Sequence, residues 1–111
     1  MDLEVVRRSA HEASTLLKAM ANERRLLILC YLAEGERSVG ELEVLIGISQ
    51  SALSQHLARL RQDGLVASRR AAQNIYYSLD GDDVTKIIAT LHDILSQDND
   101  DTEARDRWVG K

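Results

Sequence analysis

Residues 49–66 read SQSALSQHLARLRQDGLV, in which leucines recur among serine, glutamine and arginine side chains. Leu53, Leu57 and Leu60 follow one another at spacings of four and three residues, so they predict one buried stripe of a helix. Ser49 is a suitable N-cap, and Gly64 can adopt the left-handed conformation that ends a helix. The stretch therefore predicts a helix over about 50–63 with an exposed face rich in hydrogen-bonding groups.

A short helix is expected immediately before this one. Ser38-Val39-Gly40-Glu41 has the Ser-x-x-Glu spacing of a capping box, in which two side chains satisfy free backbone N–H groups at a helix start. It predicts a helix over about 39–46, and Gly47-Ile48-Ser49 then supplies a tight turn. Two short helices joined by about three residues have the spacing of a helix-turn-helix.

A β-hairpin is expected after Gly64. The segments LVASRR at 65–70 and NIYYSL at 74–79 are short, the second is rich in Ile and Tyr, and AAQ at 71–73 separates them. A hairpin in this position is a wing. A last helix is expected from about residue 80, because Asp82 and Asp83 suit a first turn and apolar residues then recur with a helical period.

Two more helices are expected ahead of the helix-turn-helix, over about 3–18 and, after an Asn22 cap, over 23–33. The second reads ERRLLILCYLA and is expected to be buried on most sides. The predicted order is ααααββα, and 111 residues suffice for one domain only. The predicted fold class is mainly α with a β-hairpin: a dimeric winged helix-turn-helix, one domain over 1–111, with an acidic tail at 98–111.

The first and last predicted helices each carry an apolar stripe at helical spacing. Either both stripes close the core of one copy, or they join two copies. We favour a homodimer, with the other possibility left open. The residues expected at the dimer interface are Leu3, Val6, Ala10, Ala13 and Leu17 in the first helix, and Ile87, Ile88, Leu91 and Leu95 in the last.

Charge is unevenly distributed along the chain. The formal net charge is −4, which by itself does not favour binding to phosphates. However, residues 49–78 contain four arginines and one aspartate, whereas residues 98–111 contain more acidic than basic side chains. The sequence shows no signal-peptide pattern and no apolar run of about 18 residues. We therefore expect a cytoplasmic protein that binds no membrane.

The polar face of the 50–63 helix suits the major groove of B-DNA, where Gln pairs with adenine, Ser reaches several base edges and Arg favours guanine. Wing residues suit phosphates or the adjacent minor groove. The alternatives are a merely solvated face and a surface that docks a protein. For His56, a phosphate contact and a partly buried slot beside Leu53 and Leu60 are both open. The candidate contacts to double-stranded promoter DNA are Ser49, Gln50, Ser51, Ser54, Gln55, His56, Arg59, Arg61, Arg69, Arg70, Gln73 and Asn74.

Catalysis finds no supporting constellation in the sequence. His11, His56 and His92 lie far apart, and there is no Gly-rich phosphate loop, Cys-x-x-Cys or His-Glu-x-x-His. Neither enzyme activity nor a cofactor is therefore expected. Cys30 is the only cysteine, so an intramolecular disulfide is excluded. In an apolar helix, Cys30 is expected to behave as a small hydrophobe with a raised pKa.

The segments LKAMANERRLLILCYL, SVGEL, SQSALSQHLARLRQDGLV and YYSL together resemble the ArsR/SmtB family of winged-helix transcriptional regulators, over about residues 12–97. The resemblance is closest to the thiol-sensing, HlyU/BigR-like branch of that family. It implies a sequence-specific DNA-binding repressor or anti-repressor, a homodimer joined through the first and last helices, and a recognition helix at about 50–63.

The resemblance also bears on what such a regulator senses. Metal-binding members carry Cys-x-Cys or ligands spaced along the last helix, and here Leu32 and Val84 stand at two of those positions, so a metal-responsive repressor is the less favoured alternative. The thiol-sensing branch uses a cysteine in the central helix, which Cys30 matches, and a second one where this chain has Ser96. Ser96 is either a natural variant or an engineered replacement. Serine cannot form the bridge, which leaves Cys30 with sulfenylation, persulfidation or a mixed disulfide, or with no sensing role.

Overall fold

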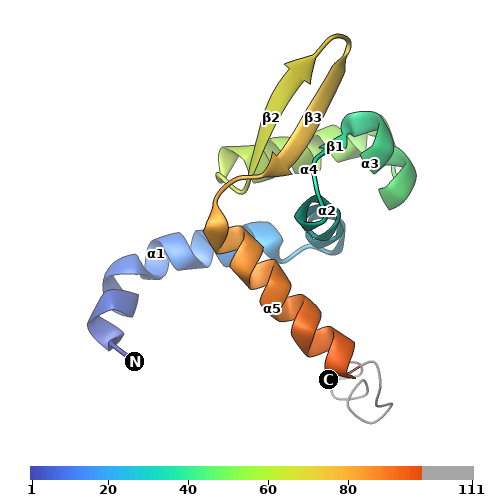
Figure 1. Cartoon of the computed structure of the whole chain (residues 1–111). Helices are drawn as coiled ribbons and strands as arrows, with labels where there is room; N and C mark the ends of the chain where they lie inside the picture. The colour runs from blue at the N-terminus through green and yellow to red at the C-terminus, as the bar shows by residue number, and fades with distance from the viewer. Residues whose placement is uncertain (99–111) are drawn as a thin grey trace.

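The computed structural model describes residues 1–98 of the chain (Figure 1). Of the expected acidic tail, residues 99–111 lie outside the described residues. The predicted order of helices and strands is confirmed, with one short strand added. In chain order the elements are α1 (Leu3–Met20), α2 (Glu23–Ala33), β1 (Arg37–Ser38), α3 (Val39–Ile46), α4 (Gln50–Gln62), β2 (Val66–Ala71), β3 (Asn74–Leu79) and α5 (Asp82–Asp98).

Capping residues determine where the two helices of the helix-turn-helix begin and end. The predicted capping box of α3 is confirmed: the backbone N–H of Glu41 donates to Ser38 Oγ over 3.1 Å, and the N–H of Ser38 donates to Glu41 Oε1 over 3.0 Å. Ser49 caps α4 by accepting from the N–H of Ala52 over 3.1 Å. Gly64 follows the end of α4 with φ +77°, a conformation that costs glycine no steric strain. Local chemistry thus sets the bounds of both helices.

The core lies under the helix-turn-helix, where one apolar stripe of each helix meets the base of the sheet. The predicted stripe of α4 is confirmed, because Leu53, Leu57 and Leu60 are buried almost completely. They pack in one cluster with residues from α1, α2, α3, β2 and α5. The other members of the cluster are Ala19, Met20, Ile28, Leu29, Leu32, Leu42, Leu65, Val66, Val84 and Ile88.

The expectation that α2 is buried on most sides is wrong. Only Ile28, Leu29 and Leu32 of this helix are buried, whereas Leu27 is 40% exposed and Cys30 is exposed as well. The reason is that α2 packs one face onto the core cluster and leaves another face uncovered in the single copy. The apolar composition of α2 indicated that the helix would be buried, but it could not indicate how many of its faces the other helices and strands of the same chain would cover.

The additional strand completes a three-stranded antiparallel sheet in the order β1-β3-β2. Arg37 pairs with Tyr77 and Ser38 with Tyr76 across β1 and β3. The two residues of β1 are too few to show the period-two alternation by which a strand is recognised in a sequence. This strand therefore had no local signal, and only its partner β3 defines it.

Figure 1 shows that the β2–β3 hairpin projects from one end of the molecule and α5 from the other, while the N-terminal half of α1 extends away from the remaining helices. Residues 1–14 are all exposed. The C-terminal end of α1 is held by Arg25 of α2, whose Nε donates to the carbonyl oxygen of Ala19 over 2.6 Å. Its Nη2 donates to the carbonyl oxygen of Lys18 over 3.3 Å. One arginine thus satisfies two carbonyls at the end of α1.

Candidate nucleic-acid interface

The first half of α4 carries the polar side chains that were predicted to contact bases. Because its leucines face the core, Gln50, Ser51, Ser54 and Gln55 are all exposed. Such a helix fits the major groove, and helix-turn-helix proteins place the N-terminal half of the recognition helix there. The arrangement leaves these hydroxyl and amide groups free to bond to base edges.

A groove of about 690 Å³ lies between α4, α3 and the hairpin. It brings Gln50, Ser54 and Arg61 of α4 together with Gln73 and Asn74 at the hairpin tip. These five of the predicted contact residues therefore share one concave surface, although three of them belong to a helix and two to the hairpin that follows it in the sequence. The hairpin turn itself contains Ala72 with φ +57°, a conformation that non-glycine residues rarely adopt.

Strand pairing places the two wing arginines on opposite faces of the sheet. Arg69 lies opposite Tyr76 on β3, and Arg70 lies opposite Ile75. Directly opposed residues of antiparallel strands share a face, and successive residues alternate between faces. Because Ile75 lines the groove beside α4, Arg70 lies on the groove face and Arg69 on the outer face.

The other predicted arginines are also not equivalent. Arg59 forms an ion pair with Asp63, the residue that caps the end of α4, with 2.9 Å between Nε and Oδ2. Part of its charge is therefore already compensated. Arg61 is exposed and lines the groove. Within residues 1–98, Arg61 forms no ion pair.

His56 occupies the half-buried position that was one of its two expected environments. Burial lowers the pKa of the His56 imidazole, and the positive charges of Arg25 and Arg24 lower it further. The neutral form is therefore favoured in the folded chain, and the structure contains the partly buried slot. Whether this ring also reaches a phosphate stays a prediction.

The lowered pKa of His56 predicts a pH-dependent stability. The unfolded chain binds the proton more readily than the folded chain, so the stability that is present above about pH 6.5 is expected to fall as the pH drops through that value. Chemical denaturation of the chain at a series of pH values between 5 and 8 measures this slope. His56→Gln is expected to flatten it near pH 6, whereas Gln55→Ala, which keeps the imidazole of the neighbouring residue, is expected to retain it. An unchanged slope in His56→Gln would contradict the assignment.

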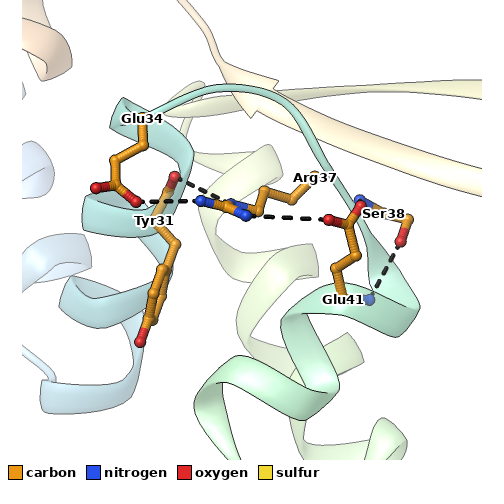
Figure 2. A network of polar contacts seen from close by, with 5 residues as sticks. All are labelled: Tyr31, Glu34, Arg37, Ser38 and Glu41. Atoms are coloured by element: carbon orange, nitrogen blue, oxygen red, sulfur yellow. Dashed lines mark hydrogen bonds and ion pairs between the residues drawn. The ribbon is translucent and has the colours of Figure 1, made fainter.

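Figure 2 shows a polar network that the sequence did not reveal, in which Arg37 links the end of α2 to the start of α3. Nη2 of Arg37 lies 3.1 Å from Glu34 Oε1, and Nη1 lies 3.9 Å from Glu41 Oε2. Nε of the same guanidinium donates to the carbonyl oxygen of Tyr31 over 3.5 Å. Hydrogen bonds from Ser38 and the charge of Arg37 hold the pKa of Glu41 below its usual value. Arg37, in the short strand β1, thus connects the start of the helix-turn-helix to the C-terminal end of α2.

The apolar stripe of α1 is exposed in the single copy. Leu17 is 58% exposed and Val6 is 49% exposed. Together with Ala10 and Ala13 they line a shallow apolar depression along the helix. Leu3 of the same predicted stripe is also exposed. A surface of this kind on a helix that extends away from its own core is typical of an interface with another chain.

The predicted stripe of α5 divides between core and surface. Ile88 was expected at a dimer interface, but it is only 3% exposed and belongs to the core of its own chain. The cause is the rotation of α5 about its axis, which turns Val84 and Ile88 toward α2. Ile87 and Leu91 are half-buried and line a second shallow apolar depression, and Leu95 is exposed. These three residues remain available for a partner.

Cys30 and Ser96 both lie at the surface. Burial by neighbouring atoms nevertheless raises the pKa of the Cys30 thiol, which keeps it protonated and lowers its nucleophilicity. Ser96 Oγ lies 3.3 Å from Nε2 of His92 on the same helix. With a single cysteine in the chain, Cys30 can react only with a thiol or oxidant from outside it.

Within residues 1–98, His, Cys, Asp and Glu side chains nowhere gather in threes at a spacing suited to a metal ion. No helix in the same range combines the length with the apolar character that a membrane crossing requires.

A helix-turn-helix whose second helix shares a groove with a β-hairpin is the arrangement of winged helix-turn-helix DNA-binding proteins, and this chain is one of them. Residues 22–68 match the family model of the bacterial regulatory proteins of the arsR family. The transcriptional activator HlyU of Vibrio cholerae is 52% identical over 99 residues, which cover 89% of this chain and 92% of that protein. The chain therefore belongs to the arsR family, as its sequence motifs predicted, and is a DNA-binding transcriptional regulator.

Two solved structures resemble the whole arrangement. The transcriptional repressor BigR from Xylella fastidiosa superposes with a TM-score of 0.80 at 41% identity, covering 85% of this chain and 96% of that one. The homodimeric winged helix-turn-helix DNA-binding domain of Mb0332 from Mycobacterium bovis gives a TM-score of 0.73 at 32% identity, covering 87% of this chain and 88% of that one. The chain is thus similar both to a transcriptional activator and to a transcriptional repressor.

Proposed function

We propose that the chain regulates transcription as a homodimer in which α1 and α5 of two copies pack together and the two α4 helices enter successive major grooves. In dimeric helix-turn-helix proteins these grooves lie about 34 Å apart, so the operator is expected to be a pseudo-palindrome. The exposed apolar stripe on α1 supports the pairing of copies. The homodimeric relative from Mycobacterium bovis supports it as well.

The observation that carries the DNA-binding role is the groove that joins the polar half of α4 to the hairpin tip. In this proposal Gln50, Ser54 and Gln55 read base edges, while Arg61 and Arg70 contact phosphates; their exposure and their position at the groove face support these roles. A dimer bound in this way excludes other proteins from the same promoter segment. Repression and anti-repression both follow from such exclusion, depending on which protein is displaced.

The proposal is tested by a mobility-shift titration of the purified chain on its own upstream region over a range of salt concentrations. The logarithm of the binding constant is expected to fall linearly and steeply with the logarithm of salt, because phosphate contacts release counterions. A surface that docks a protein instead of DNA would give no such slope. Footprinting of the same complex then locates the operator.

Base reading and phosphate contact are expected to respond differently to substitution. Gln55→Ala is expected to cost about 1–3 kcal/mol on the operator and little on random DNA, because a bidentate contact to one base is lost. Arg70→Ala, the matched control, is expected to weaken binding to both DNAs and to flatten the salt slope by about one. Equal losses for the two variants on both DNAs would contradict these assignments.

A further inference from the structure

The Arg69 side chain of the wing makes both an ion pair and a contact with an aromatic ring. Its Nε lies 2.8 Å from Glu36 Oε2 and its Nη2 lies 2.6 Å from Glu36 Oε1, which is a bidentate pair between residues 33 positions apart in the chain. The guanidinium also lies over the ring of Tyr76, with 4.6 Å between its central carbon and the ring centroid. The Arg69 side chain holds the pKa of the Glu36 carboxyl below its usual value. Both ends of the contact are therefore charged at neutral pH.

This contact spans the whole width of the sheet. Arg69 belongs to β2 and Tyr76 to the central strand β3, while Glu36 immediately precedes β1 at the opposite edge. The arginine thus crosses the middle strand and bridges the two outer ones. Because Arg69 lies on the face away from the groove, this bridge is built on the outer surface of the wing.

A wing of this construction needs such a bridge. An isolated two-stranded hairpin is marginally stable in water, and β1 adds only two residues to β2 and β3. The outer half of the hairpin has no described core residue, since buried positions of the sheet stop at Val66. The position of the tip relative to α4 therefore depends on contacts made part-way along the strands, where Arg69 stands.

We propose that Arg69 is a positioning residue, clamped between Glu36 and Tyr76, which fixes the hairpin over the groove so that Arg70 and the tip residues reach DNA. Arg69 itself makes no contact with a phosphate in this arrangement. The sequence predicted a direct DNA contact for Arg69, and the experiments below distinguish the two roles. The proposal rests on the DNA-binding role proposed above, and it assigns a function to Glu36, an acidic residue of a DNA-binding protein.

The sign of one substitution separates the clamp from a direct phosphate contact. Removing an acidic side chain near a DNA-binding surface ordinarily strengthens binding, because a repulsive charge is lost. If Arg69 contacted a phosphate directly, Glu36→Ala would free the Arg69 side chain for that contact, and DNA binding would become stronger still. The clamp predicts the opposite: Glu36→Ala is expected to weaken operator binding by about two- to fivefold, the factor that corresponds to one exposed ion pair.

A control variant removes a comparable charge without touching the clamp. Asp80, between β3 and α5, is exposed, lies outside the groove and forms no ion pair within residues 1–98. Asp80→Ala is expected to leave operator affinity unchanged, because the lost carboxylate touches neither the clamp nor the groove. Weakening by Glu36→Ala together with no weakening by Asp80→Ala supports the clamp. Stronger binding by Glu36→Ala would overturn it.

Hydrogen exchange of the hairpin amides tests the clamp without any DNA. Glu36→Ala and Arg69→Ala are each expected to speed exchange of the paired amides of β2 and β3 by about two- to fivefold, while the amides of α4 keep their protection. The exchanged pair, Glu36→Arg with Arg69→Glu, is expected to recover protection and part of the affinity. A direct phosphate contact predicts instead that this double variant binds DNA most weakly of all.

The two readouts keep the hypotheses apart. Unchanged exchange in both single variants would overturn the clamp whether or not the chain binds DNA. A wild-type chain that shows no salt-dependent mobility shift on DNA would overturn the proposed DNA-binding role. Faster amide exchange in the Glu36→Ala and Arg69→Ala variants would still show that the Arg69–Glu36 contact stabilises the hairpin.

Discussion

The Leu17→Asp chain is expected to stay folded, to sediment as a monomer, and to lose about 10²- to 10⁴-fold in affinity for a two-site operator. Leu17 is 58% exposed in the single copy, so aspartate there disturbs little of its own core. In the proposed dimer, however, the carboxylate would be buried against the partner's apolar stripe, which is strongly unfavourable. The loss of affinity follows because the second half-site would no longer be bound intramolecularly.

Sedimentation equilibrium and a mobility shift on the operator measure the two effects. Val44→Asp is the matched control, because Val44 is a still more exposed apolar residue, 82% exposed on α3, outside the proposed interface. This control is expected to remain dimeric. A dimer that survives Leu17→Asp unchanged would remove α1 from the interface.

The Leu53→Ala chain is expected to lose about 2–5 kcal/mol of the free energy of unfolding. Leu53 is completely buried under the first half of α4, where it lies in one cluster with α2, α3 and the base of β2. Truncation removes transfer free energy and leaves a cavity that a closely packed core fills only in part. α4 carries the polar groups of the groove. The operator affinity of the Leu53→Ala chain is therefore expected to fall even under conditions in which this chain is still folded.

Chemical denaturation followed by circular dichroism measures this loss. Val44→Ala on α3 serves as a control for an apolar truncation at the surface, and its expected effect is within about 0.5 kcal/mol. A loss below about 1 kcal/mol for Leu53→Ala would show that Leu53 does not support α4 as described.

The helices and the hairpin could be predicted because their signals are local. Ser38 and Glu41 cap α3 through contacts three residues apart, and Leu53, Leu57 and Leu60 define the buried face of α4 by spacing alone. Such signals need no knowledge of the rest of the chain. The same reasoning failed for β1, whose two residues become a strand only by pairing with β3.

The surroundings of the candidate site were harder to predict, because they depend on residues far apart in the chain. Arg69 and Arg70 are neighbours in the sequence and were both predicted to contact DNA, yet strand pairing turns them to opposite faces. The period of two along a strand could have indicated this separation. Nothing in the sequence indicated that Glu36 would meet Arg69, since that pair depends on the packing of β1 against β3. The composition of α2 likewise could not predict that Leu27 and Cys30 would be left uncovered.

The hydrogen bonds from Arg25 to the last carbonyls of α1 have a mechanical consequence. They join the helix through which the copies are proposed to pair to the helix that underlies α4, and His56 of α4 lies within reach of the same charge. A hinge at this junction must either break those bonds or carry α2 with it. In the proposed dimer, the two hydrogen bonds of Arg25 are therefore expected to limit how far the α4 helices can shift to fit operators whose half-sites differ in spacing.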